Sequence, residues 1–190
     1  MSDFIPFPKR KYNVIYVDPP WRYSDKGCNG NAAKHYPTLS FKEMCRLPVS
    51  DIAAKDCVLL LWATYPMMRE ALFLTDAWGF TYKSLAFQWL KQNKSGNGYF
   101  FGLGRWTRGN TEPCLLATRG KPQRVSNSVS QLVISPLREH SRKPDEVRDR
   151  IVELIGDVPR IELFARQQAP GWDCWGNEAP IIGGGTLHDA

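Results

Sequence analysis

The chain of 190 residues lacks the features that mark secreted, membrane-spanning or metal-binding proteins. Its five cysteines are odd in number and widely spaced, so neighbours in the sequence form neither a disulfide framework nor a CxxC zinc pair. Its three histidines lack metal-ligand spacing, so we expect no bound metal. No apolar run exceeds seven residues, which excludes a transmembrane helix, and no signal peptide opens the chain. These absences predict a reduced, cytoplasmic protein with no membrane partner.

The composition is that of a globular protein, with 43% hydrophobic, 12% aromatic and 23% charged residues. It is too aromatic for a disordered chain and too varied for a fibrous one. A chain of this length buries about two-thirds of the surface that it exposes when unfolded. We therefore expect one domain over residues 1–178, followed by a flexible tail at residues 179–190 that contains three consecutive glycines.

Short apolar segments alternate with amphipathic ones along the chain. Strands are predicted at Tyr12–Val17, Cys57–Ala63, Phe80–Leu90, Pro113–Thr118, Leu132–Ser135 and Arg160–Ala165. Helices are predicted at Ser40–Leu47, where Ser40 and Glu43 have capping-box spacing, and at Pro66–Trp78 and Pro144–Ile155. This alternation is typical of an α/β fold with a mainly parallel sheet that helices cover on both faces.

In such sheets, ligands bind beyond the carboxyl ends of the strands. Asp18 directly follows the first predicted strand, and Arg166 directly follows the last. Both strand ends should open onto the same rim of the sheet, so we expect two half-sites there.

The sequence Asp18-Pro19-Pro20-Trp21 predicts a rigid turn at that rim. Two prolines remove two backbone donors and restrict the residues before them to extended geometry. The turn therefore offers a carboxylate and bare carbonyls, which only accept hydrogen bonds, next to a large aromatic ring. One interpretation is a site for a flat group that carries an NH2, with Trp21 stacked on its ring. The other is a strand-ending turn with a tryptophan of the core.

Positive charge is concentrated in the middle of the chain. Between Lys83 and Lys143 there are eleven Lys and Arg residues against two acids, within a chain of net charge +6. Aromatic residues interleave with these cations, which suits phosphate contact and base stacking. The alternative is a solvated basic face above core aromatics. If this stretch contacts nucleic acid, these cations should lie on loops around the rim of Asp18: Lys91, Lys94, Arg105, Arg108, Lys121 and Arg124.

The Asp-Pro-Pro-Trp turn resembles the catalytic motif of S-adenosylmethionine-dependent amino-methyltransferases. Further blocks narrow the resemblance to the family that includes the catalytic subunit of the eukaryotic mRNA adenosine methyltransferase and small bacterial and phage members. The resembling blocks cover nearly everything from Asn13 to Glu178: Tyr16–Tyr23, His35–Ser40, Leu60–Thr64, Gly104–Leu116, Arg138–Glu146 and Glu162–Glu178. The resemblance implies a Rossmann-like methyltransferase fold with a circularly permuted motif order, in which the catalytic strand comes first and the cofactor strand last.

The resemblance also implies roles for the residues of the motif. Asp18 and the carbonyl of Pro19, braced by Pro20, would hold the adenine amine, and accepting its hydrogens pushes the nitrogen lone pair toward the methyl group. Whether Asp18 takes the proton stays open. Trp21 would stack on a base flipped out of its helix, beneath a lid at residues 22–39 that carries Tyr36. The block Gly104–Leu116 adds further candidate substrate-binding residues, namely Arg105, Trp106, Arg108 and Glu112.

For S-adenosylmethionine, the resemblance assigns Asp18 and five further residues: Lys143, Arg166, Gln168, Asn177 and Glu178. Lys143 would hold the carboxylate of the cofactor near the positive end of a helix. The alternative is a solvent-facing lysine balanced by Asp145 and Glu146. Ala165–Ala169 departs from the mRNA enzyme because it lacks a histidine and an asparagine found there, which weakens the individual contacts.

These observations predict an adenine-N6 methyltransferase that acts on DNA. RNA is the alternative substrate, and cytosine-N4 methylation comes third. A different class of protein is a catalytically silent subunit that only binds nucleic acid. The intact Asp-Pro-Pro-Trp turn argues against this alternative. Since no separate recognition domain fits in 190 residues, we expect specificity to come from loops or from a homodimer or paired subunit, or to be low.

Overall fold

The computed structural model describes residues 6–21, 39–104, 106–139 and 142–176. Its centre is one seven-stranded sheet with the order β5-β3-β4-β2-β1-β6-β7. The strands are β1 (Tyr12–Val17), β2 (Ala53–Trp62), β3 (Thr81–Gln92), β4 (Thr111–Arg119), β5 (Leu132–Pro136), β6 (Arg160–Leu163) and β7 (Asp173–Trp175). Only β4 runs antiparallel to its neighbours, β2 and β3. The other paired strands are parallel, which confirms a mainly parallel sheet.

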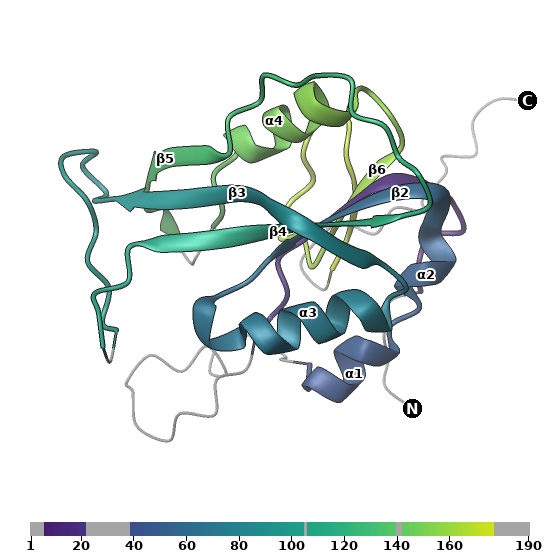
Figure 1. The fold of residues 1–190 in the computed structure, drawn as a ribbon, viewed down its shortest axis with the longest axis horizontal. Coiled ribbons are helices and arrows are strands. Elements are labelled where there is room, and N and C mark those ends of the chain that lie inside the picture. Colours follow the sequence, from purple (N-terminus) through teal and green to yellow (C-terminus); the bar gives the residue numbers. More distant parts are fainter. Residues whose placement is uncertain (1–5, 22–38, 105, 140–141, 177–190) are drawn as a thin grey trace, which may run out of the picture.

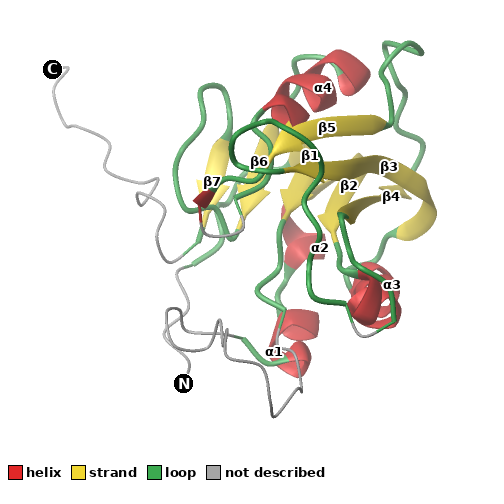
Figure 2. Ribbon diagram, turned by 90° about the vertical axis from the view of Figure 1, so that its left-hand side faces the viewer, coloured by secondary structure: helices red, strands yellow, loops and turns green. Residues whose placement is uncertain are grey.

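Helices cover both faces of the sheet, as the sequence predicts (Figure 1). They are α1 (Phe41–Arg46), α2 (Val49–Ile52), the 3-10 turn η2 (Tyr65–Met67), α3 (Met68–Ala77) and α4 (Glu146–Ile155). The first four pack on one face, and α4 packs on the other with Val147 and Ile151 buried. The view turned by 90° shows the same three layers (Figure 2). No helix in the described part of the chain is long and apolar enough to cross a membrane.

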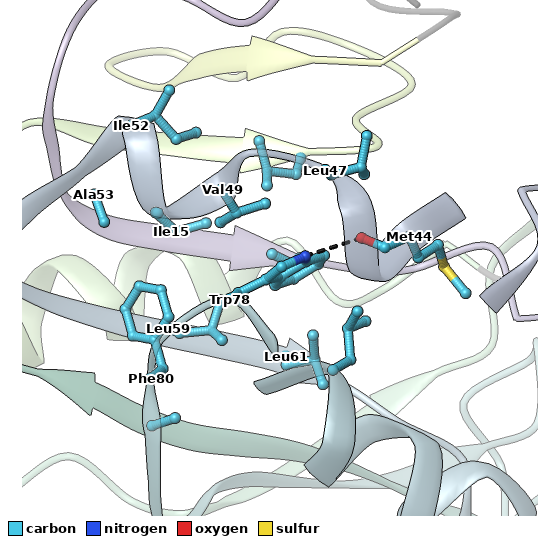
Figure 3. Close-up of a cluster of buried hydrophobic side chains, with 14 of the residues drawn as sticks. Ile15, Met44, Leu47, Val49, Ile52, Ala53, Leu59, Leu61, Trp78 and Phe80 are labelled. Carbon is cyan, nitrogen blue, oxygen red and sulfur yellow. Dashed lines mark hydrogen bonds between the residues drawn. The ribbon is translucent and has the colours of Figure 1, made fainter. Parts of the chain in front are cut away.

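Successive side chains of the buried strands point to opposite faces of the sheet and so contribute to both halves of the core. In β1, Ile15 and Val17 face the layer of α1, α2 and α3, while Val14 and Tyr16 face that of α4. Trp78 lies at the centre of the first half, where it packs with Ile15 and Leu59 and donates from Nε1 to the carbonyl of Met44 at 2.9 Å (Figure 3). This bond satisfies the indole N–H and ties α1 to the end of α3.

β1 pairs with β6 in the sheet, although the two strands are far apart in the sequence. Val17 pairs with Leu163, so the carboxyl ends of β1 and β6 share one rim of the sheet. The sequence predicts this shared rim correctly. The predicted last strand, Arg160–Ala165, differs from the structure in two respects. β6 ends at Leu163, because Phe164 has a φ of 59°, and a further strand, β7, follows at the edge of the sheet.

Candidate active site

Asp18 stands at the carboxyl end of β1, between the ends of β2 and β6. The turn that follows is tight, because the N–H of Trp21 donates to the carbonyl of Pro19 at 2.8 Å. Pro19 is buried and Pro20 half-buried, so both brace the turn. A carbonyl oxygen has a second lone pair, which leaves Pro19 able to accept from a ligand as well.

Trp21 belongs to the core. Its side chain is packed in the cluster of α1, α2 and α3, and its Nε1 donates to the carbonyl of Trp62 at 3.2 Å. This placement supports the core tryptophan that the sequence left as an alternative. Stacking of Trp21 on a base stays a prediction.

The side chain of Lys143 connects Asp18 to Glu112. Its Nζ lies 2.9 Å from Asp18 Oδ2 and 3.0 Å from Glu112 Oε1. Glu112 in turn binds Lys91 Nζ through Oε2 at 2.7 Å. We call these four side chains the rim ion-pair chain: Lys91, Glu112, Lys143 and Asp18. The prediction of a solvent-facing Lys143 balanced by Asp145 and Glu146 is wrong, because its side chain is only 10% exposed and its acidic partners are Asp18 and Glu112.

The rim ion-pair chain consists of alternating positive and negative charges that are largely buried. Burial raises the pKa of Asp18, and the charges of Lys143 and Arg166 oppose that rise. Burial also acts to raise the pKa of Glu112, but the ammonium groups of Lys143 and Lys91 outweigh it and hold this pKa below its ordinary value. Desolvation acts to lower the pKa of Lys143, but the two carboxylates outweigh it and raise this pKa. Lys143 and Glu112 are therefore both charged at neutral pH.

Two tryptophan rings, which we call the aromatic floor, lie against the two lysines on the side of the core: Trp62 and Trp89. Lys143 Nζ lies 5.6 Å from the ring centre of Trp62, and Lys91 Nζ lies 5.0 Å from that of Trp89. Trp62 donates from Nε1 to the hydroxyl of Tyr16 at 2.6 Å, so the floor has no unpaired indole at this point. Aromatic faces attract cations without adding a negative charge that would compete with the carboxylates.

A second ion-pair cluster fixes the segment that carries Lys143. Arg148 on α4 makes a bidentate pair with Glu162 on β6, at 2.7 and 3.0 Å, and also binds Asp145 Oδ1 at 2.9 Å. Arg138 and Arg142 bind the other oxygen of Asp145. These contacts tie the start of α4 to the sheet, next to Lys143-Pro144.

Sequence reasoning missed both ion-pair clusters. A signal for them exists in the sequence, because Glu112 and Glu162 are single acids within apolar strands. A buried carboxylate requires a cationic or hydrogen-bonding partner. The identity of those partners depends on the topology, since Lys91, Lys143 and Arg148 lie on three other segments.

The remaining predicted site residues divide into three groups. Arg166 and Gln168 are exposed on the segment that follows β6, and the charge of Arg166 acts on Asp18. Arg108 and Trp106 are exposed on the segment between β3 and β4, where Trp106 is 99% exposed. The predicted roles of Tyr36, Arg105, Asn177, Glu178 and the lid at residues 22–39 fall wholly or mainly outside the described residues.

The predicted basic track is only partly at the rim of Asp18. Lys94 and Arg108 lie on the loop between β3 and β4, which we call the rim loop (residues 93–110). Tyr99 and Phe101 on this loop are also exposed. Lys121 and Arg124 are at the opposite rim, because the N–H of Lys121 donates to Asp56 near the start of β2, and Val125 bonds to the end of α4. Lys91 lies on β3 within the rim ion-pair chain. The prediction of loops around the rim of Asp18 is therefore wrong for Lys121 and Arg124, which lie at the other rim, and for Lys91, which lies at the rim of Asp18 but on a strand.

The described residues contain no group of three or more His, Cys, Asp or Glu side chains that could hold a metal ion. Asp18 and Pro19 instead offer hydrogen-bond acceptors to a ligand at the rim. The site presents a carboxylate and a carbonyl beyond an interior strand, with an exposed guanidinium and an exposed amide after the neighbouring strand.

A mostly parallel seven-stranded sheet with this pair of half-sites at one rim defines a Rossmann-like methyltransferase. The chain belongs to the MT-A70 family, whose model matches residues 12–178.

Individual relatives differ in how much of their length the chain covers. It is 38% identical to the type II methyltransferase M.MunI of Mycoplasma sp. over 197 aligned positions, which cover 93% of this chain and 82% of that protein. It is 29% identical to the N(6)-adenosine-methyltransferase catalytic subunit METTL3 of Homo sapiens, over 88% of this chain and 28% of that protein. A putative MT-A70-like N(6)-adenosine-methyltransferase of Medicago truncatula is 30% identical, and the chain spans 26% of its length. The chain thus spans about a quarter of the length of these plant and animal relatives.

Proposed function

We propose that the chain transfers a methyl group from S-adenosylmethionine to the N6 amine of adenine in DNA. The observation that carries this proposal is the presentation of Asp18. Its Oδ2 is held by Lys143, while its Oδ1 has no hydrogen-bond partner among the described residues. The side chain is 33% exposed, so this oxygen can accept a hydrogen from a ligand at the rim.

An adenine amine suits that acceptor. The amine is a poor nucleophile because its lone pair is conjugated with the ring. Asp18 Oδ1 and the carbonyl of Pro19 would accept its two hydrogens, return electron density to the nitrogen and stabilise the positive charge that develops there during transfer. Holding the amine in line with the methyl group supplies a further share of the acceleration.

The chemistry of the rim fits the proposed cofactor. S-adenosylmethionine supplies an electrophilic methyl group on a sulfonium centre, together with a carboxylate, an ammonium and ribose hydroxyls. The described rim offers the carboxylate of Asp18, the guanidinium of Arg166 and the amide of Gln168. The family resemblance adds Asn177 and Glu178. Lys143 would reach the cofactor carboxylate only in competition with Asp18 and Glu112.

DNA is the substrate that the comparisons favour. The relative with 38% identity and matching length is a type II methyltransferase, and type II methyltransferases as a class modify DNA. Lys94, Arg108 and the exposed aromatic residues Tyr99, Phe101 and Trp106 lie on the rim loop. Cations and rings together suit an extruded nucleotide and the strand beside it. The similarity to METTL3 makes RNA the second candidate.

The test is transfer of a labelled methyl group from S-adenosylmethionine to three matched oligonucleotides: single-stranded DNA, duplex DNA and RNA. Each is paired with a version in which every adenine is replaced. We expect incorporation into adenine-containing DNA. Incorporation into RNA alone would shift the substrate to the second candidate, and binding without incorporation into any of them would identify a silent subunit.

A further inference from the structure

Lys91 is the member of the rim ion-pair chain at the end opposite to Asp18. It lies near the end of β3, its Nζ binds Glu112 at 2.7 Å, and the ring of Trp89 lies beneath it. Its side chain is 21% exposed. A lysine whose ammonium is committed to a buried carboxylate is a poor phosphate contact, so another role has to be considered.

The order of charges along the rim ion-pair chain indicates that role. Two carboxylates, Glu112 and Asp18, share one ammonium, that of Lys143. If Glu112 were protonated, its charge would no longer compete with Asp18 for Lys143, and Lys143 would neutralise Asp18 more completely. Because the charge of Glu112 raises the pKa of Asp18, its loss would leave Asp18 a less basic carboxylate that accepts the amine hydrogen less well. An ionised Glu112 therefore keeps Asp18 effective, and the charge next to Glu112 on its other side belongs to Lys91.

We infer that Lys91 is a positioning residue for methyl transfer: it holds Glu112 ionised, so that Lys143 is shared between Glu112 and Asp18 and Asp18 Oδ1 remains a strong acceptor for the substrate amine. This inference rests on the proposed function. It assigns to Lys91 an effect on turnover and none on nucleic-acid affinity.

The test is Lys91→Gln, with kcat measured on adenine-containing DNA between about pH 5.5 and 8.5. Loss of an opposite charge at this distance should raise the pH at which Glu112 takes up a proton by about 1–2 units. The acid limb of kcat should move up with it, so that the loss is largest at the acid end of this range and has recovered near pH 8. The KM for DNA should stay unchanged. Lys91→Arg should restore the wild-type profile.

The charged and titratable groups that act on Asp18 and Glu112 remain in place in this variant: Lys143 before α4, Glu162 on β6, Arg166 after it and Cys114 on β4. Lys83→Gln is the matched control, because Lys83 is exposed on the same strand at the opposite end of the sheet. It should leave the pH profile unchanged. A readout without turnover is carboxylate NMR, in which Glu112 should titrate at higher pH in Lys91→Gln than in the wild type.

Several outcomes would overturn the inference. An active wild type with an unchanged profile in Lys91→Gln would refute it and leave the proposed function standing. A higher KM with an unchanged kcat would make Lys91 a phosphate contact. An equal loss at every pH in Lys91→Gln and Lys91→Arg would make it merely structural. Unchanged NMR titration of Glu112 would refute the linkage independently of activity, and a wild type that methylates no nucleic acid would refute both proposals.

Discussion

At the scale of single residues, the site depends on charges that are held in place by partners from distant segments. Lys143 has its charge balanced by Asp18 and Glu112, and Arg148 has its charge balanced by Glu162 and Asp145. Pairs of this kind contribute little if both members are replaced by apolar groups, but removing one member leaves an uncompensated buried charge. Each pair can therefore be tested by a single truncation.

Arg148→Ala should destabilise the protein by about 3 kcal/mol, because it leaves the buried carboxylate of Glu162 without its bidentate partner. Urea denaturation of wild type and variant measures this. Arg10→Ala is the control, since the pair of Arg10 with Asp173 is exposed and 3.4 Å long, and it should change stability by less than about 1 kcal/mol. Equal effects of the two substitutions would contradict a structural role for the pair of α4 and β6.

Lys143→Gln should move the acid limb of kcat to higher pH. Lys143 lowers the pKa of Asp18 against the effect of burial, so its loss raises that pKa and Asp18 takes up a proton at higher pH. The displacement should be about 1–2 pH units. Calorimetric titration with S-adenosylmethionine tests the second predicted role of Lys143: a contact to the cofactor carboxylate would cost about 1.5–3 kcal/mol of binding free energy. Unchanged affinity would confine Lys143 to the rim ion-pair chain.

At the scale of elements, local sequence signals place the helices that cover the sheet. The capping box of α1 is present as predicted, with the N–H of Glu43 donating to Ser40 Oγ and the N–H of Ser40 donating to the Glu43 carboxylate. Through Met44, α1 also accepts the indole N–H of Trp78, which links the helix to the core.

Ser40→Ala should therefore cost about 1 kcal/mol of folding stability, the usual effect of losing such a cap. The thermal unfolding midpoint reports it. Ser50→Ala is the matched control, because the hydroxyl of Ser50 bonds only weakly to Asp51, at 3.5 Å, and caps no helix. An identical midpoint for wild type and Ser40→Ala would show that α1 is held by its tertiary contacts alone.

The same comparison shows what a sequence can predict here. The long apolar segments of β1, β2 and β4 and the amphipathic α3 and α4 follow from periodicity and lie where it predicts them, within a few residues. The four-residue α2 and the three-residue β7 do not, because each spans little more than one repeat of its pattern, which is too short to show a periodicity. The turn after β1 is predictable because two prolines mark it. The partnership of Lys91, Glu112 and Lys143 is not, since it is created by tertiary contacts between segments far apart in the sequence.

At the scale of the whole molecule, the cations of the basic stretch are divided between the two rims of the sheet. Lys94 and Arg108 lie on the rim loop beside the site, whereas Lys121 and Arg124 lie at the far rim. Each phosphate that a protein neutralises releases counterions, so only cations that contact nucleic acid steepen the dependence of affinity on salt.

Reversal of Lys94 and Arg108 to Glu should flatten the slope of log affinity against log salt by about 2, one for each lost phosphate contact. Fluorescence anisotropy on a short DNA oligonucleotide at several salt concentrations measures the slope. The same reversal of Lys121 and Arg124 changes the net charge equally and should leave the slope near that of the wild type. Equal flattening in both double variants would indicate a general effect of net charge and would argue against the rim loop as the DNA contact.

The central claim is that Asp18 presents an acceptor to the N6 amine of adenine. Its most direct test is mass spectrometry of nucleosides from DNA incubated with S-adenosylmethionine and either the wild type or Asp18→Ala. We predict N6-methyladenine as the product of the wild type and a rate at least about a hundredfold lower in the variant, because aligning and polarising the amine is worth several kcal/mol. Calorimetry should show that the variant still binds the cofactor, so that the lost rate does not reflect a loss of the fold. A variant rate within about tenfold of the wild type, or a methyl group on any other atom, would contradict the account.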